Sequence, residues 1–242
     1  SAASDVYKRQ EHLNPWVRLW SARLIGDEGE GSGQEYAKLA SLAKKDTHVE
    51  VRQQLASTAK RLPPGPSANI LKGLLKPDED ASDPYMPLMG WWALENLCSE
   101  DPDRAMELFD DASLFGHAMV KNHILGFLMK RFALKGDRRS LAYCAKLLNL
   151  ASDPTSKKAL LAGFEEAFEG RTIQGLPNEL VDALVETIPD DELQSSCGIN
   201  IDGPILDLTE KKNDEMSLVD MKLIALVLKK NTSVKCLKRG DM

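Results

Sequence analysis

The side chains best suited to metal binding or nucleophilic catalysis are four histidines and four cysteines, and they are scattered along the chain. No two histidines stand in a His-Glu-x-x-His pattern, no Gly-x-Ser-x-Gly turn accompanies them, and no two cysteines form a Cys-x-x-Cys pair. The sequence therefore predicts no catalytic residue, no metal ligand set and no covalent haem site in this chain. Cys98 and Cys144 fall within helical apolar patterns, so we expect both to be buried.

Two other local patterns resemble ligand sites without meeting their spacing. The acidic run Asp78 to Asp83 offers carboxylates to a hard cation, but Asp83 stands where a calcium loop needs glycine and Met89 where it needs glutamate. The glycines at 29, 31 and 33 follow a predicted helix instead of a strand, which does not fit a phosphate-binding loop. We predict a solvated acidic loop and a linker.

A Val-Arg pair occurs twice in the first part of the chain, as Val17-Arg18 and again as Val51-Arg52. An arginine at the start of a helix can reach a carboxylate in the preceding turn, and Asp46, six residues before Arg52, is the predicted partner. This reading makes Asp46 and Arg52 members of a structural ladder. Binding of an anionic ligand by Arg18 and Arg52 is the alternative, because the guanidinium fork suits either use.

Adjacent tryptophans at 91 and 92 form the most conspicuous aromatic cluster. On a helix such neighbours point about 100° apart, so they cannot fill the same hole. One is expected in the core and the other at a partner or domain contact, although packing alone would also account for the pair. Trp16 and Trp20 lie one turn apart and are expected to cover the exposed edge of a helical stack.

The elements that must position these residues are helices. A 34-residue near-repeat relates Pro15–Leu24 to the segment from His48, and apolar residues recur at helical spacing in most of the remaining chain. Such a period indicates short helix pairs, about six in a chain of this length. The predicted fold class is all-α: an α-solenoid, or right-handed superhelix, of HEAT-like pairs.

Local signals also predict where some helices start, end and face. Val51, Leu55, Ala59 and Leu62 form an apolar stripe at helical spacing. Helix ends are expected at Gly26-Asp27 and Gly136-Asp137, and Pro87 is expected near the start of its helix.

Composition excludes some functions. The net charge of the 242-residue chain is −6, which gives no overall attraction to nucleic acid, and no stretch approaches the roughly 20 apolar residues of a membrane-spanning helix. We expect neither a nucleic-acid partner nor membrane insertion by this segment. The predicted partners are proteins, or neighbouring domains of the same parent chain.

The chain divides into four predicted parts. Residues 1–10 look like a translated sequencing adapter and are set aside, residues 11–188 form the solenoid, 189–217 an irregular loop, and 218–242 a further, truncated repeat helix. The short Ile-rich alternation within 198–208 is read as part of that loop. We expect the chain to belong to a longer protein.

Several segments together resemble the HEAT-repeat region of planctomycete-type membrane-bound dehydrogenases: Asn14 to Asp27, Leu42-Ala43, Val51 to Ala56, Arg61-Leu62-Pro63 and Asp83 to Glu95. In that family the repeats lie between a β-propeller and a c-type cytochrome module with a Cys-x-x-Cys-His site. The resemblance implies an exported, for example periplasmic, sugar or alcohol dehydrogenase as the parent. It transfers no catalytic residue, and haem c would belong to a C-terminal module outside this chain.

The sequence leaves three hypotheses for function. The first is a non-catalytic scaffold, the spacer of a larger haem-containing dehydrogenase. The second is a stand-alone protein- or peptide-binding solenoid that uses Trp91 or Trp92 with Arg18 and Arg52. The third and remotest is a helical-repeat enzyme, such as a lyase or glycosylase, because an acidic chain without an acid–base cluster does not suit that chemistry.

Overall fold

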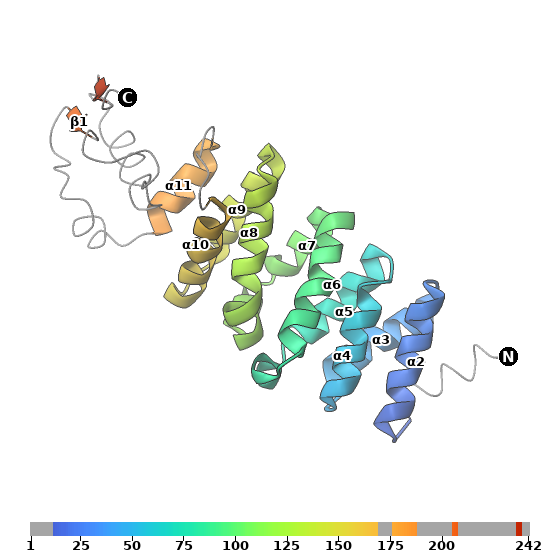
Figure 1. Cartoon of the computed structure of the whole chain (residues 1–242). Helices are drawn as coiled ribbons and strands as arrows, with labels where there is room; N and C mark the ends of the chain where they lie inside the picture. Colours follow the sequence, from blue (N-terminus) through green and yellow to red (C-terminus); the bar gives the residue numbers. More distant parts are fainter. Residues whose placement is uncertain (1–11, 169–175, 188–204, 208–235, 239–242) are drawn as a thin grey trace. The chain divides into compact units, whose positions relative to one another are not determined.

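A computed structural model describes residues 12–168, 176–187, 205–207 and 236–238 (Figure 1). This part of the chain is helical apart from one pair of three-residue strands. The helices pack against one another in two compact units, the first ending at Leu128 and the second beginning at Met129. The elements of the first unit up to residue 124 are α2 (Pro15–Glu28), α3 (Gly33–Lys45), α4 (Val49–Ala59), α5 (Pro64–Leu74), η1 (Asp78–Ser82), α6 (Met86–Glu100), α7 (Pro102–Glu107), η2 (Leu108–Asp110), η3 (Ala112–Gly116) and η4 (Val120–Ile124). Then follow α8 (Leu125–Lys135), α9 (Arg138–Leu150), α10 (Pro154–Phe168), α11 (Asn178–Thr187), β1 (Ile205–Asp207) and β2 (Cys236–Lys238).

Helix α2 is bounded by residues with clear roles. The Asn14 side chain accepts a hydrogen bond from the backbone N–H of Trp16 at 2.9 Å, and Pro15 occupies the first turn, where its missing N–H costs least. The helix ends at Gly29, whose φ of 71° is in the left-handed region that glycine favours. The sequence suggested an end at Gly26-Asp27. Gly26 instead lies inside the helix, where α4 comes close.

The next helix boundaries also follow from local chemistry. Ser32 and Glu35 form a reciprocal capping box at the start of α3. The proline-rich run beginning at Pro63 follows α4 and also starts the next helix, because Pro64 is the first residue of α5. Pro87 falls in the first turn of α6, as the sequence predicted.

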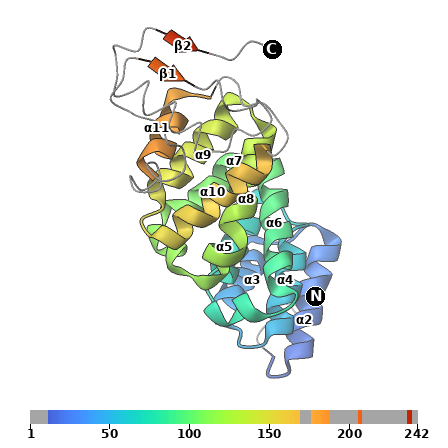
Figure 2. The same cartoon turned by 60° about the vertical axis from the view of Figure 1, so that its left-hand side comes forward.

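In the first unit each helix packs on the helix two positions further along the chain. Helix α4 contacts both α2 and α6, while α3 contacts α5 and α5 contacts α7. Figures 1 and 2 show α2, α4 and α6 side by side, with α5 against α4 and α6. The predicted apolar stripe of α4 is confirmed, because Val51, Leu55, Ala59 and the following Leu62 are all buried.

Two glycines allow close helix packing in this unit. A Cβ atom on Gly26 would lie 2.9 Å from the Thr58 hydroxyl oxygen of α4, and one on Gly73 would lie 2.9 Å from the Ala43 backbone carbon of α3. Both distances are too short for a real Cβ contact, so these positions of α2 and α5 need glycine to bring neighbouring backbones together.

In the second unit α9 packs against α10 and α11. Gly136, with a φ of 67°, and Asp137, which accepts a hydrogen bond from the Ser140 N–H at 2.8 Å, separate α8 from α9. The Gly136-Asp137 stop predicted from the sequence is therefore confirmed. Phe132 and Tyr143 pack with ring centroids 5.0 Å apart, and Leu148 and Phe164 add to the core.

The strands differ from the sequence prediction. β1 and β2 pair in parallel, with Ile205 opposite Cys236 and Asp207 opposite Lys238. Residues 205–207 were expected in a loop and 236–238 in a repeat helix. Pairing between segments this far apart along the chain depends on tertiary contact, which a periodicity search does not detect. The other residues of the helix predicted at 218–242, and the adapter-like residues 1–10, lie outside the described residues.

Candidate functional site

The two predicted arginines form matching ion pairs between successive turns of the first unit. Arg18 donates from Nε and Nη2 to the two carboxylate oxygens of Asp46, at 2.6 and 2.8 Å. Arg52 binds Asp80 in the same two-point manner, with Nε 2.7 Å from Oδ2. Each pair joins residues 28 positions apart. We call Arg18–Asp46 and Arg52–Asp80 the two rungs.

A third donor of each arginine reaches back six residues to a backbone carbonyl. Nη1 of Arg52 donates to the Asp46 backbone oxygen at 2.6 Å, and Nη1 of Arg18 donates to the His12 backbone oxygen at 2.8 Å. The two rungs are thus equivalent and stand one sequence repeat apart. The prediction that the Asp46 carboxylate pairs with Arg52 is wrong: Asp46 offers Arg52 its backbone oxygen, while its carboxylate binds Arg18.

The rungs are largely removed from water. Arg52, Asp46 and Asp80 are buried. Burial acts to raise the pKa of Asp46, but hydrogen bonds from Arg18 and from the His48 N–H, together with the nearby positive charge, leave that pKa below its usual value. Hydrogen bonding to Asp80 raises the pKa of Arg52, against the opposing effect of burial. Because both arginines are held by these partners, the geometry favours the ladder role over a ligand role.

Part of the acidic run from Asp78 to Asp83 belongs to the same ladder. Asp80 is 1% exposed, so the prediction of a solvated loop is wrong at its centre. Asp83 accepts hydrogen bonds from the backbone N–H groups of Tyr85 and Met86, at 2.9 and 2.8 Å, at the start of α6. Asp78 accepts one from the Ala118 N–H at 2.7 Å. Asp80 could have been found from the sequence, because it stands one repeat after Asp46.

The adjacent tryptophans divide as the sequence predicted. Trp91 is 8% exposed and packs on Phe127 with ring centroids 5.4 Å apart. Trp92 is 45% exposed, and the ammonium of Lys60, the C-cap residue of α4, lies 5.8 Å from its ring centroid. Trp91 is therefore a core residue, and of the two only Trp92 offers a large surface to a partner.

Trp92 belongs to a larger apolar surface on α6. Leu88, one turn earlier, and Tyr85, at the helix N-cap, are exposed on the same side. We call Tyr85, Leu88, Trp92 and the neighbouring Lys60 the α6 aromatic surface. Sequence reasoning missed three of these four residues, although the i, i+3, i+7 spacing of Tyr85, Leu88 and Trp92 marks one helix face. Tryptophan and tyrosine are residue types enriched at protein-binding surfaces.

A second exposed apolar group lies on α2. Trp16, Trp20 and Leu24 recur every four residues and are 54%, 53% and 44% exposed. The Arg23 guanidinium carbon lies 5.0 Å from the Trp20 ring centroid. These exposures agree with the prediction that Trp16 and Trp20 lie at an edge of the helical stack.

Two of the cysteines, Cys98 and Cys144, are core residues. Cys98 and Cys144 are buried, as predicted, and burial raises the pKa of the Cys144 thiol to about 12. A thiol with such a pKa is protonated at neutral pH and is a poor nucleophile. Within the described ranges no three His, Cys, Asp or Glu side chains are grouped as a metal site would need, and no helix is long and apolar enough to cross a membrane.

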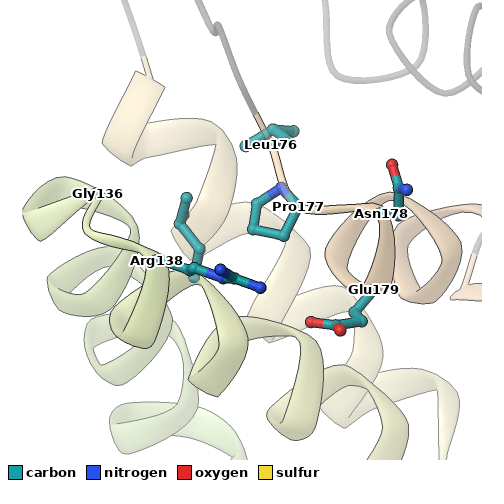
Figure 3. A pocket seen from close by; sticks show the side chains of 7 residues that line it. Gly136, Arg138, Leu176, Pro177, Asn178 and Glu179 are labelled. Carbon is teal, nitrogen blue, oxygen red and sulfur yellow. The ribbon is translucent and has the colours of Figure 1, made fainter.

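An open pocket of about 460 Å³ lies in the second unit, between the start of α9 and the start of α11. Figure 3 shows Arg138 and Glu179 extending from these two helices, with Pro177 beside them. Both charged side chains are exposed. A second pocket, of about 600 Å³ and lined by α3, adjoins the first rung at Arg18 and Asp46. Neither pocket brings together an acid and a base in a buried setting, so the α6 aromatic surface is the stronger candidate.

Comparison with protein-family models, with curated proteins and with solved structures finds no match to this chain.

Proposed function

We propose that this chain is a non-catalytic interaction module, built as an α-solenoid of HEAT-like helix pairs, that holds other protein parts at a fixed geometry. The observation that carries the proposal is the recurrence of one complete rung, with its carboxylate and its backbone acceptor, one sequence repeat after the first. Repetition of the same inter-helix contact is how stacked repeats build an extended and regular body.

The packing order supports the solenoid part of the proposal. Helices α2, α4 and α6 contact one another in turn, and α3, α5 and α7 do the same, as successive pairs of a stacked array would. The rungs then serve as spacers between layers. A buried bidentate pair contributes more to geometry than to net stability, because desolvation offsets much of its attraction.

We further propose that the module is the spacer of a larger exported dehydrogenase whose haem group lies in another domain. This step depends on the resemblance of residues 14–95 to the repeat region of that family. The test is to recover the complete reading frame and to stain its expressed product for covalent haem. A propeller on one side and a haem-positive module on the other are the expected result.

The isolated chain provides a second readout. We expect circular dichroism of this chain to be dominated by helix and its redox activity with sugar or alcohol substrates to be nil. A predominantly β spectrum would exclude the solenoid. Turnover by the isolated chain would exclude the non-catalytic role and favour the remote alternative of a helical-repeat enzyme.

A stand-alone protein- or peptide-binding solenoid is the second candidate, and the half-exposed Trp92 beside Lys60 favours it. Buried tryptophans at interfaces often cost about 2 kcal/mol or more when truncated, on the order of a thirtyfold loss of affinity. We expect Trp92→Ala to lose a partner that the wild-type chain retains, while Trp20→Ala on α2 keeps it. A Trp92→Ala chain that folds normally and keeps every partner would count against this candidate.

A further inference from the structure

Helix α4 packs on α2, and Thr58 lies in this contact. Val51, Gln54 and Thr58 follow the i, i+3, i+7 spacing of one helix face. Val51 and Thr58 are fully buried, and the Thr58 hydroxyl donates to the Ala22 carbonyl oxygen of α2 at 2.9 Å. Across this contact α2 presents two small residues, Ala22 and Gly26.

The same positions recur on α6, one repeat later. Tyr85, Leu88 and Trp92 correspond to Val51, Gln54 and Thr58. Trp92 is also directed at the preceding helix, since its ring lies over the Lys60 ammonium next to α4. On α4 this face meets α2 at Thr58, whereas on α6 it is only partly covered: Trp92 lies near Lys60, but Tyr85, Leu88 and Trp92 are 66%, 44% and 45% exposed.

On α2 the corresponding residues are Val17, Trp20 and Leu24. No helix of the described segments covers them: Trp20 is 53% and Leu24 is 44% exposed, whereas Thr58, at the Leu24 position, is 0% exposed. We call Val17, Trp20 and Leu24 the outer face of α2. It is apolar at all three positions, although its counterparts on α4 include glutamine and threonine.

The turn before α2 is built like the turn that joins α3 to α4. In the latter, the His48 N–H donates to the Asp46 side chain at 3.0 Å, and Arg52 binds the Asp46 backbone oxygen. Before α2, the Asn14 N–H donates to the His12 side chain at 3.1 Å, and Arg18 binds the His12 backbone oxygen. His12 thus takes the place of Asp46 in this type of turn. One repeat later, at Asp46, the same type of turn follows a helix.

From the repeated face and the repeated turn together, we propose that the outer face of α2 packs against a further helix pair of the same repeat type, in the same polypeptide. Its second helix lies on α2 as α2 lies on α4, with small residues at the positions of Ala22 and Gly26 against Trp20 and Leu24. This inference goes beyond the proposed function and does not depend on the identity of any parent enzyme.

The test supplies such a pair from the chain itself. A tandem duplication of residues 14–47 places a second copy of α2 and α3, with the correct register, directly before the original Asn14. We expect amide hydrogen exchange in the original α2, at Val17 and Ser21 for example, to slow roughly tenfold or more because the face becomes buried. The helical circular dichroism signal should rise in step with the added helices.

The matched control is the same duplication with Leu24→Glu in the original α2, which places a charge in the proposed contact. Slower exchange that is abolished by this substitution supports the proposal. Unchanged exchange in α2 with rapid proteolysis of the added copy would overturn it. So would a wild-type chain that forms a dimer in light scattering and loses it on Leu24→Glu, since the occupant would then be a second copy.

Discussion

At the scale of single residues, the rungs combine strong geometry with burial. Arg52 and Asp80 meet through two parallel hydrogen bonds while both are almost completely removed from water. One repeat later, the chain has Met86 in place of the arginine and Leu114 in place of the aspartate, both of them buried. Equivalent positions are thus occupied by a buried ion pair in one repeat and by two buried apolar residues in the next.

This comparison predicts a non-additive pair of substitutions. Arg52→Met alone leaves the Asp80 carboxylate buried without its cation and should lower the free energy of unfolding by about 3 to 5 kcal/mol. Arg52→Met combined with Asp80→Leu introduces the residue types that stand one repeat later, at Met86 and Leu114. This double variant should recover roughly half of that loss of unfolding free energy or more. Urea unfolding measures both.

The control is Arg61→Met. Arg61 pairs with Asp27 at the surface, where both side chains are about one-third or more exposed, so its loss should cost about 1 kcal/mol or less. A double variant at positions 52 and 80 that is no more stable than Arg52→Met would contradict the role assigned to the buried pair.

A second prediction at the residue scale concerns how the free energy of unfolding changes at low pH. The folded-state pKa of Asp46 is lowered from the ordinary value of 3.8. The stability contributed by its ionised form is therefore complete above pH 3.8 and is lost as the pH falls through the folded-state pKa. Unfolding free energies of wild type and Asp46→Asn should differ by a constant amount near neutrality, and the gap should narrow below pH 3.8. A gap that widens in acid would refute this assignment.

At the scale of elements, close packing of α3 on α5 depends on one missing side chain. An added Cβ at Gly73 would lie 3.0 Å from the Ala43 Cβ as well as 2.9 Å from its backbone carbon. Crowding of this kind typically costs about 1 to 3 kcal/mol, which exceeds the roughly 1 kcal/mol that alanine gains over glycine in a helix. Gly73→Ala should therefore lower the thermal midpoint.

Gly90, inside α6, is the matched comparison, because the nearest atom to its added Cβ is a Leu75 methyl carbon at 4.0 Å. Gly90→Ala should keep or raise the midpoint, since helix propensity then acts without a clash. Equal effects of the two substitutions would show that backbone approach does not distinguish these glycines.

At the scale of the whole molecule, stability should be local. In a stack of repeats each helix pair is stabilised mainly by its neighbours. A destabilising substitution therefore lowers stability mainly in its own pair and in the adjacent pairs. Arg52→Met should accelerate amide hydrogen exchange in α3 to α6 and leave the exchange of α9 to α11 close to wild type. Uniform acceleration across both units would indicate a single cooperative body instead.

Local sequence patterns are sufficient to predict the helices and several of their faces. Periodic apolar residues place α4 with Val51 and Leu55 inward, because a helix must bury one stripe whatever it packs against. The angle between adjacent helical residues separates Trp91 from Trp92. The Gly136-Asp137 stop is equally local, since it depends on a left-handed φ and a side-chain cap.

Which side chains meet across the helices depends on how the helices stack, and local patterns do not reveal it. Arg52 chooses Asp80 over the carboxylate of the nearer Asp46 because helix stacking brings the next turn, 28 residues on, to its guanidinium. Gly26 serves close packing instead of a helix end because α4 approaches there. The parallel strands join segments that share no local pattern. Sequence spacing sets which face a residue occupies, whereas the neighbour across that face is fixed by how the helices stack.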